Sequence, residues 1–193
     1  WFTNVQAPYF EQSIELLNAK VKSHYVRFFD ATSTNIHLIE NATALLQSEQ
    51  VRPELIERSW AQVETAIDAV CKEIDTNAEV ASKLAENSGV RVEAKFFQEP
   101  LRTKAKILSP ISMGYLELLH KADGLILVLE SLRLRGILKR ADADRQVNYL
   151  GHRMKVGPRC AFQLAVGLRK LAKGETSGSS SEASASTGST LAD

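Results

Sequence analysis

The stretch Val90–Leu108 constrains the fold more than any other, because polar and apolar residues alternate in it over two runs separated by Gln98-Glu99-Pro100. The first run alternates Val90, Val92, Ala94 and Phe96 with Arg91, Glu93 and Lys95. The second run alternates Leu101, Thr103, Ala105 and Ile107 with Arg102, Lys104 and Lys106. A period of two is typical of half-buried strands, so the stretch predicts a β-hairpin with one apolar and one charged face.

A two-stranded hairpin is not stable alone in water, so its apolar face must pack on helices or pair with another chain. The opposite face then presents Arg102, Lys104 and Lys106 to the outside. A β-ribbon with outward basic side chains fits the major groove of DNA. Lysines on an exposed strand also protect its edge against aggregation, and the strand alone leaves both interpretations open.

Steps of three and four between apolar residues predict six helices around the hairpin. Three precede it, at Ala7–Ala31, Ile36–Gln47 and Pro53–Glu86, and three follow it, at Ser109–Leu134, Ala141–Met154 and Arg159–Leu171. Gly157-Pro158 is expected to interrupt the chain between the last two of these helices. The predicted fold class is therefore mainly α with one β-hairpin (α+β), a helical bundle that carries a ribbon.

Charge divides the chain into three regions. Residues 1–87 hold 7 Lys and Arg against 13 Asp and Glu, whereas residues 88–173 hold 17 against 7. Residues 174–193 are mostly Ser, Ala, Thr and Gly, a composition typical of a disordered tail. We expect the acidic helical region to dimerise or to dock other proteins. The basic region is expected to meet a polyanion.

The basic residues are the candidate binding site. Those on the ribbon are predicted to contact bases in the groove: Lys95, Arg102, Lys104 and Lys106. Those beside the ribbon and near helix ends are predicted to contact phosphates: Arg91, Arg153, Lys155 and Arg159. Five more lie near helix ends and turns: Arg133, Arg135, Lys139, Arg140 and Arg145. A protein partner with an acidic face would suit these residues equally well.

The sequence offers no support for catalysis. It contains no P-loop, GxGxxG, GxSxG or HExxH motif, and its four histidines lie on separate segments. Cys71 and Cys160 stand alone, which favours buried free thiols in a reducing cytoplasm. No apolar run approaches the roughly 20 residues of a membrane span. We therefore expect no enzyme activity, no cofactor, no metal and no membrane partner.

A strand followed by two helices is the order of elements in a ribbon-helix-helix DNA-binding unit, which two subunits build together. Here the strand would be Leu101–Leu108, and the helices Ile111–Leu134 and Ala141–Met154. The first helix is longer than that unit normally uses, and the strand at Val90–Phe96 is extra. The prediction is a decorated, ribbon-helix-helix-like unit.

Residues 54–173 also resemble a known family. The segments that carry the resemblance are W-x-x-V-E-x-A-I-D-A-V, G-V-R-V-E, E-P-L-R-T-K-A-K-I, G-Y-L-E-L-L-x-x-A-D-x-L-I and R-G-I-L-K-R-A-D-A-D-R. Their order is similar to that in the integrating conjugative element proteins that include the AcaB transcriptional regulators of conjugative plasmids. The chain departs from the family at Leu108-Ser109-Pro110-Ile111, where members have an Asn-Pro-Tyr-Gly-like entry to the helix.

The resemblance implies a homodimeric activator that binds double-stranded DNA at conjugative transfer genes, on a plasmid or an integrative element, in a bacterial cytoplasm. RNA polymerase or another regulator would be a further partner. The resemblance does not show which residues contact bases. The alternative is a structural or adaptor protein of the conjugation machinery, whose basic region binds a protein.

Overall fold

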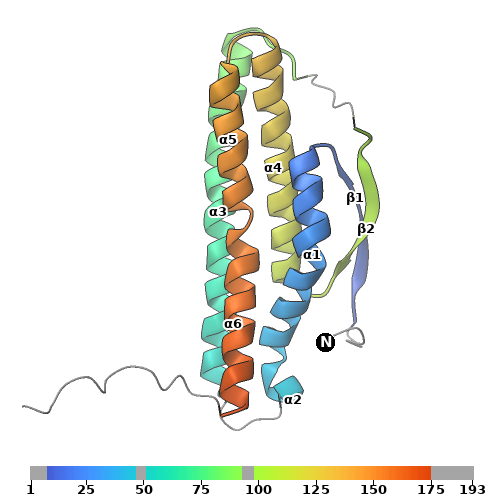
Figure 1. The fold of residues 1–193 in the computed structure, drawn as a ribbon, viewed down its shortest axis with the longest axis vertical. Helices are drawn as coiled ribbons and strands as arrows, with labels where there is room; N and C mark the ends of the chain where they lie inside the picture. Colours follow the sequence, from blue (N-terminus) through green and yellow to red (C-terminus); the bar gives the residue numbers. More distant parts are fainter. Residues whose placement is uncertain (1–7, 47–50, 93–97, 175–193) are drawn as a thin grey trace, which may run out of the picture.

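The computed structural model describes residues 8–46, 51–92 and 98–174, and nearly all of them lie in six helices and two strands (Figure 1). In chain order the elements are β1 (Phe10–Leu16), α1 (Ala19–Glu40), α2 (Ala42–Leu46), α3 (Pro53–Asn87), β2 (Leu101–Ile107), α4 (Pro110–Leu134), α5 (Arg140–Arg153) and α6 (Val156–Ala172). The fold is α+β and mainly helical, as predicted. None of the described helices is both long and apolar enough to cross a membrane.

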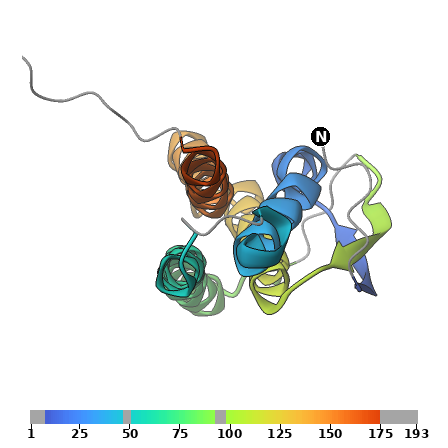
Figure 2. The ribbon, with the colours of Figure 1, turned by 90° about the horizontal axis from the view of Figure 1, so that it is seen from below.

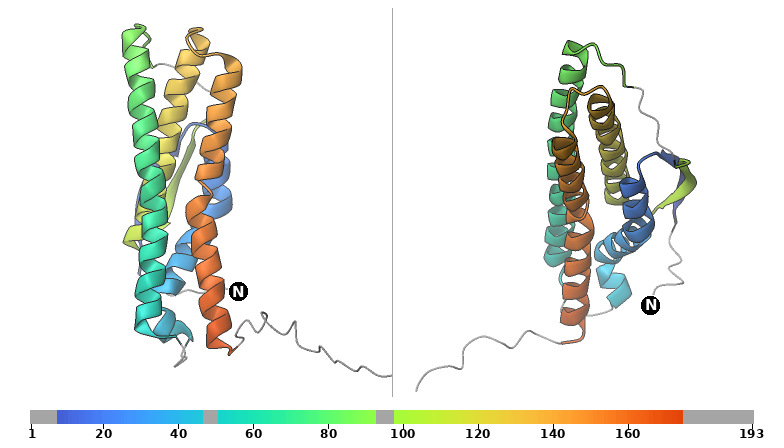
Figure 3. Two further views of the ribbon diagram at one scale, coloured as in Figure 1. Left: turned by 90° about the vertical axis from the view of Figure 1, so that its left-hand side faces the viewer. Right: turned by 45° about the horizontal axis from the view of Figure 1, so that its top comes forward.

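The elements form three layers (Figures 2 and 3). Helix α3 and the pair α5–α6 form one outer layer, α1 and α4 the middle layer, and the ribbon of β1 and β2 the other outer layer. Helix α3 packs along α4, and α1 packs along both α6 and α4. The middle layer is apolar, and α4 contributes many of the buried hydrophobic side chains: Ile111, Tyr115, Leu116, Leu118, Leu119, Ala122, Leu125, Ile126, Leu129 and Leu132.

The sequence predicted the wrong partner strand for β2. Strand β2 pairs antiparallel with β1, in a register that runs from Phe10 opposite Ile107 to Leu16 opposite Leu101. Residues 90–92 are not in a strand, and residues 93–97 of the predicted first strand lie outside the described residues. The predicted strand at Leu101–Leu108 is confirmed, and so is its alternation, because Ala105 and Ile107 are buried while Arg102, Lys104 and Lys106 are exposed.

The predicted helix at Ala7–Ala31 is wrong over its first part, where Phe10–Leu16 forms β1. Asn18 then caps α1, since its side-chain oxygen accepts a hydrogen bond from the backbone N–H of Lys20 at 2.8 Å. Helix α1 also continues through residues 32–35, which separate the first two predicted helices. The Thr32 hydroxyl donates to the carbonyl of Phe28 at 2.6 Å, so the residue keeps its polar group satisfied inside the helix.

The helices after the ribbon follow the prediction more closely. Ser109 and Ser112 form a capping box at the start of α4, with Pro110 in its first turn. Helix α6 starts at Val156, however, and includes the expected interruption at Gly157-Pro158. Pro158 is the third residue of α6, where a backbone N–H has no intrahelical partner, so proline is tolerated there.

The acidic and basic regions share one hydrophobic core, because β1 of the first pairs with β2 of the second and α1 packs on α6. The separate roles that charge suggests for the two regions stay predictions. The predicted disordered tail, apart from Gly174, lies outside the described residues.

Gly157 of α6 lies close against Ile67 of α3. A Cβ atom at this position would lie 2.9 Å from Cγ1 of Ile67 and 3.6 Å from Cδ2 of Tyr115. Because both neighbours are buried, we expect Gly157→Ala to lower the free energy of unfolding by about 1–3 kcal/mol. Urea unfolding followed by circular dichroism checks this, with Gly167→Ala as control, since no atom lies within 4 Å of a Cβ there. Equal stability of the two variants would contradict the tight contact.

Candidate nucleic-acid interface

The outer face of the ribbon consists of six exposed side chains in two rows. Strand β2 contributes Arg102, Lys104 and Lys106, and β1 contributes Glu11, Ser13 and Glu15 directly opposite them. The inner face buries Ile14, Leu16, Ala105 and Ile107 in the core. The strand alternation therefore brings three of the predicted groove contacts together on one solvent-facing surface.

Carboxylates of β1 bind two of these three cations. Arg102 donates to Glu15 Oε1 from Nε at 3.2 Å and from Nη2 at 3.0 Å. Lys104 Nζ donates to Glu11 Oε2 at 2.9 Å, a hydrogen bond that raises the pKa of Lys104. Lys106 Nζ lies 5.2 Å from the ring centroid of Tyr9. Such exposed ion pairs stabilise a fold little, so a polyanion can replace the carboxylates as partner. Glu11 and Glu15 nevertheless leave the face with a net charge of only about +1.

The predicted phosphate contacts lie in three different surroundings. Arg153 is half-buried and donates to Glu73 Oε2 from Nε at 2.8 Å and from Nη2 at 2.6 Å. Lys155 and Arg159 lie at the junction of α5 and α6, where neither has a carboxylate partner among the described residues. Arg91 is exposed and follows the end of α3. Lys95, which was predicted to contact bases and not phosphates, lies outside the described residues.

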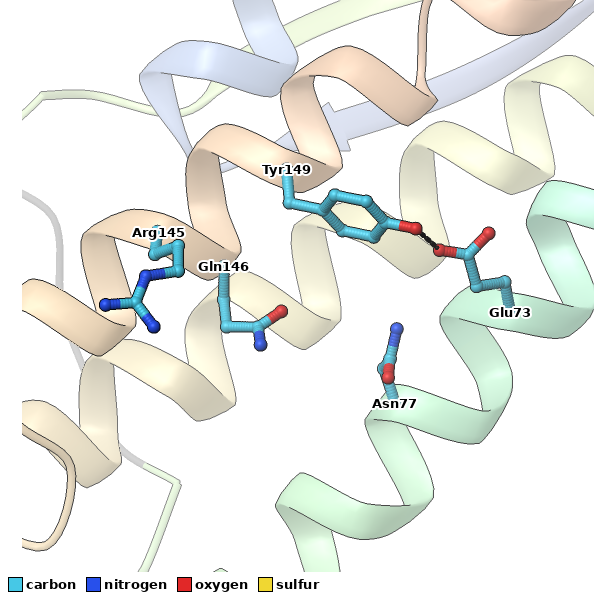
Figure 4. Close-up of a pocket in the computed structure, with 5 residues that line it drawn as sticks. All are labelled: Glu73, Asn77, Arg145, Gln146 and Tyr149. Carbon is cyan, nitrogen blue, oxygen red and sulfur yellow. Dashed lines mark hydrogen bonds between the residues drawn. The ribbon is translucent and has the colours of Figure 1, made fainter.

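Glu73 also accepts a hydrogen bond from the Tyr149 hydroxyl, which raises the pKa of Tyr149 (Figure 4). Tyr149 and Arg153 of α5 thus share one carboxylate of α3. An open pocket of about 510 Å³ lies beside this network, lined by Glu73, Asn77, Arg145, Gln146 and Tyr149. Because Arg153 of α5 binds Glu73 of α3, its side chain joins the two helices and has a structural role.

Arg91 and Arg135 converge on a second pocket at the end of the bundle where α3 and α4 finish. Its lining is Ser88, Gly89, Val90, Arg91, Arg135 and Ile137. The sequence placed both arginines among the basic residues without bringing them together. The signal that relates them is a repeated pattern, Ser88-Gly89-Val90 after α3 and Arg135-Gly136-Ile137 after α4.

The described residues hold no group of three or more His, Cys, Asp or Glu side chains that could bind a metal. The thiols of Cys71 and Cys160 are both free. Burial raises the pKa of Cys71 to about 11 and also raises that of Cys160, which disfavours the thiolate form of both side chains.

Comparison with solved structures identifies a similar arrangement. The crystal structure of selenomethionine-containing AcaB from uropathogenic E. coli superposes with a TM-score of 0.72, over 88% of this chain and 83% of that chain. The chain has an AcaB-like fold. The two sequences are 19% identical, so the likeness shows the fold alone. No protein-family model and no curated protein matches the sequence.

The AcaB-like fold separates the candidate basic residues into distinct surfaces. The ribbon presents Arg102, Lys104 and Lys106, the end of the bundle presents Arg91 and Arg135, and the α5–α6 junction presents Lys155 and Arg159. The ribbon carries the longest regular row of these cations, spaced two residues apart on one strand.

Proposed function

We propose that this protein is a transcriptional regulator that binds double-stranded DNA with the outer face of its ribbon. The observation that carries the proposal is the row of Arg102, Lys104 and Lys106 on the exposed face of a ribbon two strands wide. A two-stranded ribbon matches the width of the major groove, and arginine and lysine are the side chains that most often contact guanine there. The AcaB-like fold, with the sequence resemblance to regulators of conjugative plasmids, supports an activating role at transfer genes.

A homodimer belongs to the same proposal. Strand β2 followed by α4 and α5 has the order of a ribbon-helix-helix unit. Among the described residues, each of the two strands pairs only with the other, so each has an outer edge that a second copy can approach. Lys155 and Arg159 are the further phosphate contacts that we propose, and RNA polymerase or another regulator remains the proposed protein partner.

Glu11 and Glu15 favour a second candidate, the adaptor protein of the conjugation machinery. A face on which carboxylates alternate with cations suits a protein surface of mixed charge at least as well as a uniformly negative duplex. The two functions differ in what the carboxylates do, because they repel DNA phosphates but contribute attractive contacts to a protein.

The two candidates are separated by fluorescence anisotropy with labelled duplex DNA at about 0.15 M salt. We expect Arg102→Ala/Lys104→Ala/Lys106→Ala to weaken DNA binding at least about tenfold and to reduce the log-log salt slope by about 0.9 for each phosphate that is no longer neutralised. Lys72→Ala/Lys83→Ala/Lys170→Ala removes the same charge from exposed positions elsewhere and is expected to keep most of the affinity. Equal losses in the two triple variants would contradict a ribbon reader.

The complementary variant is Glu11→Gln/Glu15→Gln, which removes the carboxylates and keeps the size of the side chains. We expect it to bind DNA several-fold more tightly than wild type, because two negative charges no longer face the phosphates. Circular dichroism verifies that the ribbon variants fold. Unchanged or weaker DNA binding by this variant would favour the adaptor function.

A further inference from the structure

Helices α3 and α4 run in the same direction and finish side by side at one end of the bundle (Figures 1 and 3). Each ends in the same turn. Gly89 and Gly136 adopt φ of 64° and 75°, and the N–H of the following residue donates back into the helix, from Val90 to Ala85 at 2.8 Å and from Ile137 to Leu132 at 3.0 Å. The first turn is followed by Arg91 and the second begins with Arg135.

These two turns and their arginines line the open pocket of about 510 Å³ at this end of the bundle, and Ser88 is part of its lining. Both arginines are exposed, and neither has a carboxylate partner among the described residues. Three neighbouring cations do have one: Arg133 binds Glu130, Arg140 binds Asp144 and Arg145 binds Asp142. Among the described residues, by contrast, no carboxylate occupies the hydrogen-bond donors of Arg91 and Arg135.

The carboxyl ends of α3 and α4 carry negative partial charge, which cancels part of the positive charge of Arg91 and Arg135. The carboxyl end of a helix carries about −0.5 of an elementary charge, so the two ends together offset about half of the charge on two arginines. A surplus of roughly one positive charge remains in the pocket. The amino end of α5, which starts at Arg140 close to the end of α4, adds to this surplus. The balance of charge in the pocket therefore favours an anion.

We propose that the pocket between the ends of α3 and α4 binds a phosphate group, held by the guanidinium groups of Arg91 and Arg135. Planar guanidinium groups donate two parallel hydrogen bonds to an oxyanion, and two of them from different elements match the several oxygens of one phosphate. The Ser88 hydroxyl is a further donor. The phosphate comes either from a DNA backbone, which rests on the proposed function, or from a free phosphate compound, which does not.

The pocket is tested first without DNA, using inorganic phosphate as the probe. Thermal unfolding of the full chain is measured across a phosphate series, against sodium chloride of equal ionic strength. We expect phosphate to raise the unfolding temperature of wild type. Arg91→Gln/Arg135→Gln is expected to bind phosphate at least about tenfold more weakly, since hydrogen bonds between charged groups are removed. Arg91→Lys/Arg135→Lys, which keeps the charge but not the planar donors, should fall between the two.

The matched control is Arg140→Gln/Arg145→Gln, which removes two charges from the same end of the bundle outside the pocket lining. It is expected to respond to phosphate as wild type does. The proposal is overturned if wild type shows no phosphate-specific shift, if the Arg91→Gln/Arg135→Gln variant responds like wild type, or if the control loses the response equally.

The source of the phosphate is then assigned by DNA binding of the same variants across a salt series. If the pocket binds the DNA backbone, the log-log salt slope of Arg91→Gln/Arg135→Gln falls by about 0.9 for each phosphate that the variant no longer neutralises, while the control keeps its slope. If wild type and this variant have the same slope but differ in their phosphate response, the pocket serves a free phosphate compound. Because the phosphate response is measured without DNA, a failure of DNA binding leaves the test of the pocket intact.

Discussion

Replacing Asp123 with alanine is expected to lower the free energy of unfolding by about 3–4 kcal/mol, because two charge-assisted hydrogen bonds are removed. Asp123 is 6% exposed in the middle of α4. Its Oδ2 accepts from the backbone N–H of Leu17 and its Oδ1 from that of Asn18, both at 2.8 Å. These two groups lie at the turn between β1 and α1, so one side chain of the central helix holds the ribbon against the bundle.

Urea unfolding monitored by circular dichroism measures this loss, and two further variants define its cause. Asp123→Asn keeps the shape of the side chain, but its amide has only one oxygen to accept from the two backbone N–H groups. We therefore expect its free energy of unfolding to fall by about 2 kcal/mol. Asp75→Ala, which removes an exposed carboxylate 2.7 Å from Lys121, is expected to lose less than about 1 kcal/mol. A similar loss from Asp75→Ala and Asp123→Ala would show that the turn does not depend on Asp123.

Tyr115→Ala is the second change with a large expected effect, a loss of about 3–5 kcal/mol in the free energy of unfolding. Tyr115 of α4 is fully buried beside Phe29 of α1 and Gly157 of α6, where an added Cβ atom would lie 3.6 Å from its ring. Its ring lies 6.3 Å from that of Phe29 with the planes nearly parallel, and its hydroxyl donates to the carbonyl of Met154 at 3.3 Å. Truncation leaves a cavity that the surrounding helices cannot close completely.

Tyr115→Phe separates the ring from the hydroxyl, since it removes only a long hydrogen bond. We expect it to cost about 1 kcal/mol, and chemical unfolding of both variants in parallel provides the comparison. Equal losses for alanine and phenylalanine would mean that the hydrogen bond, not the packing of the ring, stabilises this junction.

Local patterns predicted the parts of the fold that local interactions determine. Helix α3 follows from its apolar spacing and Pro53, and α4 from Ser109-Pro110 and a long apolar sequence. The two faces of β2 follow from its alternation. In each case the hydrophobic period and the end signals agree, which is the condition under which sequence patterns are informative.

Strand β1 shows why the rest was not predicted. Phe10, Ile14 and Leu17 have helical spacing, but Gln12, Ile14 and Leu16 also alternate with Glu11, Ser13 and Glu15. Both periods fit, and the choice depends on β2, whose residues lie more than 80 positions further along the chain. A non-local partner leaves no signal within a local window. At Val90–Val92 the error was the opposite one, since a strand was predicted where none forms. Alternation alone does not form a ribbon without a partner strand.

The basic residues of the candidate site could be predicted from the sequence, but the carboxylates that pair with them could not. The sequence identified Arg102, Lys104 and Lys106 as one exposed row, which the fold confirms. It did not place Glu11 and Glu15 opposite them, because that requires the register of β1. It also did not bring Arg91 and Arg135 into one pocket, since this depends on α3 and α4 ending at the same level.

The measurement that tests the central proposal most directly is the affinity of the wild-type protein for the DNA upstream of its own gene and for a scrambled duplex, by fluorescence anisotropy across a salt series. We expect tighter binding to its own DNA, and affinities that fall with a log-log slope of about −0.9 for each phosphate neutralised. Absence of binding to either duplex at about 0.15 M salt would contradict the proposed regulator, and the ribbon would then be assigned to a protein partner.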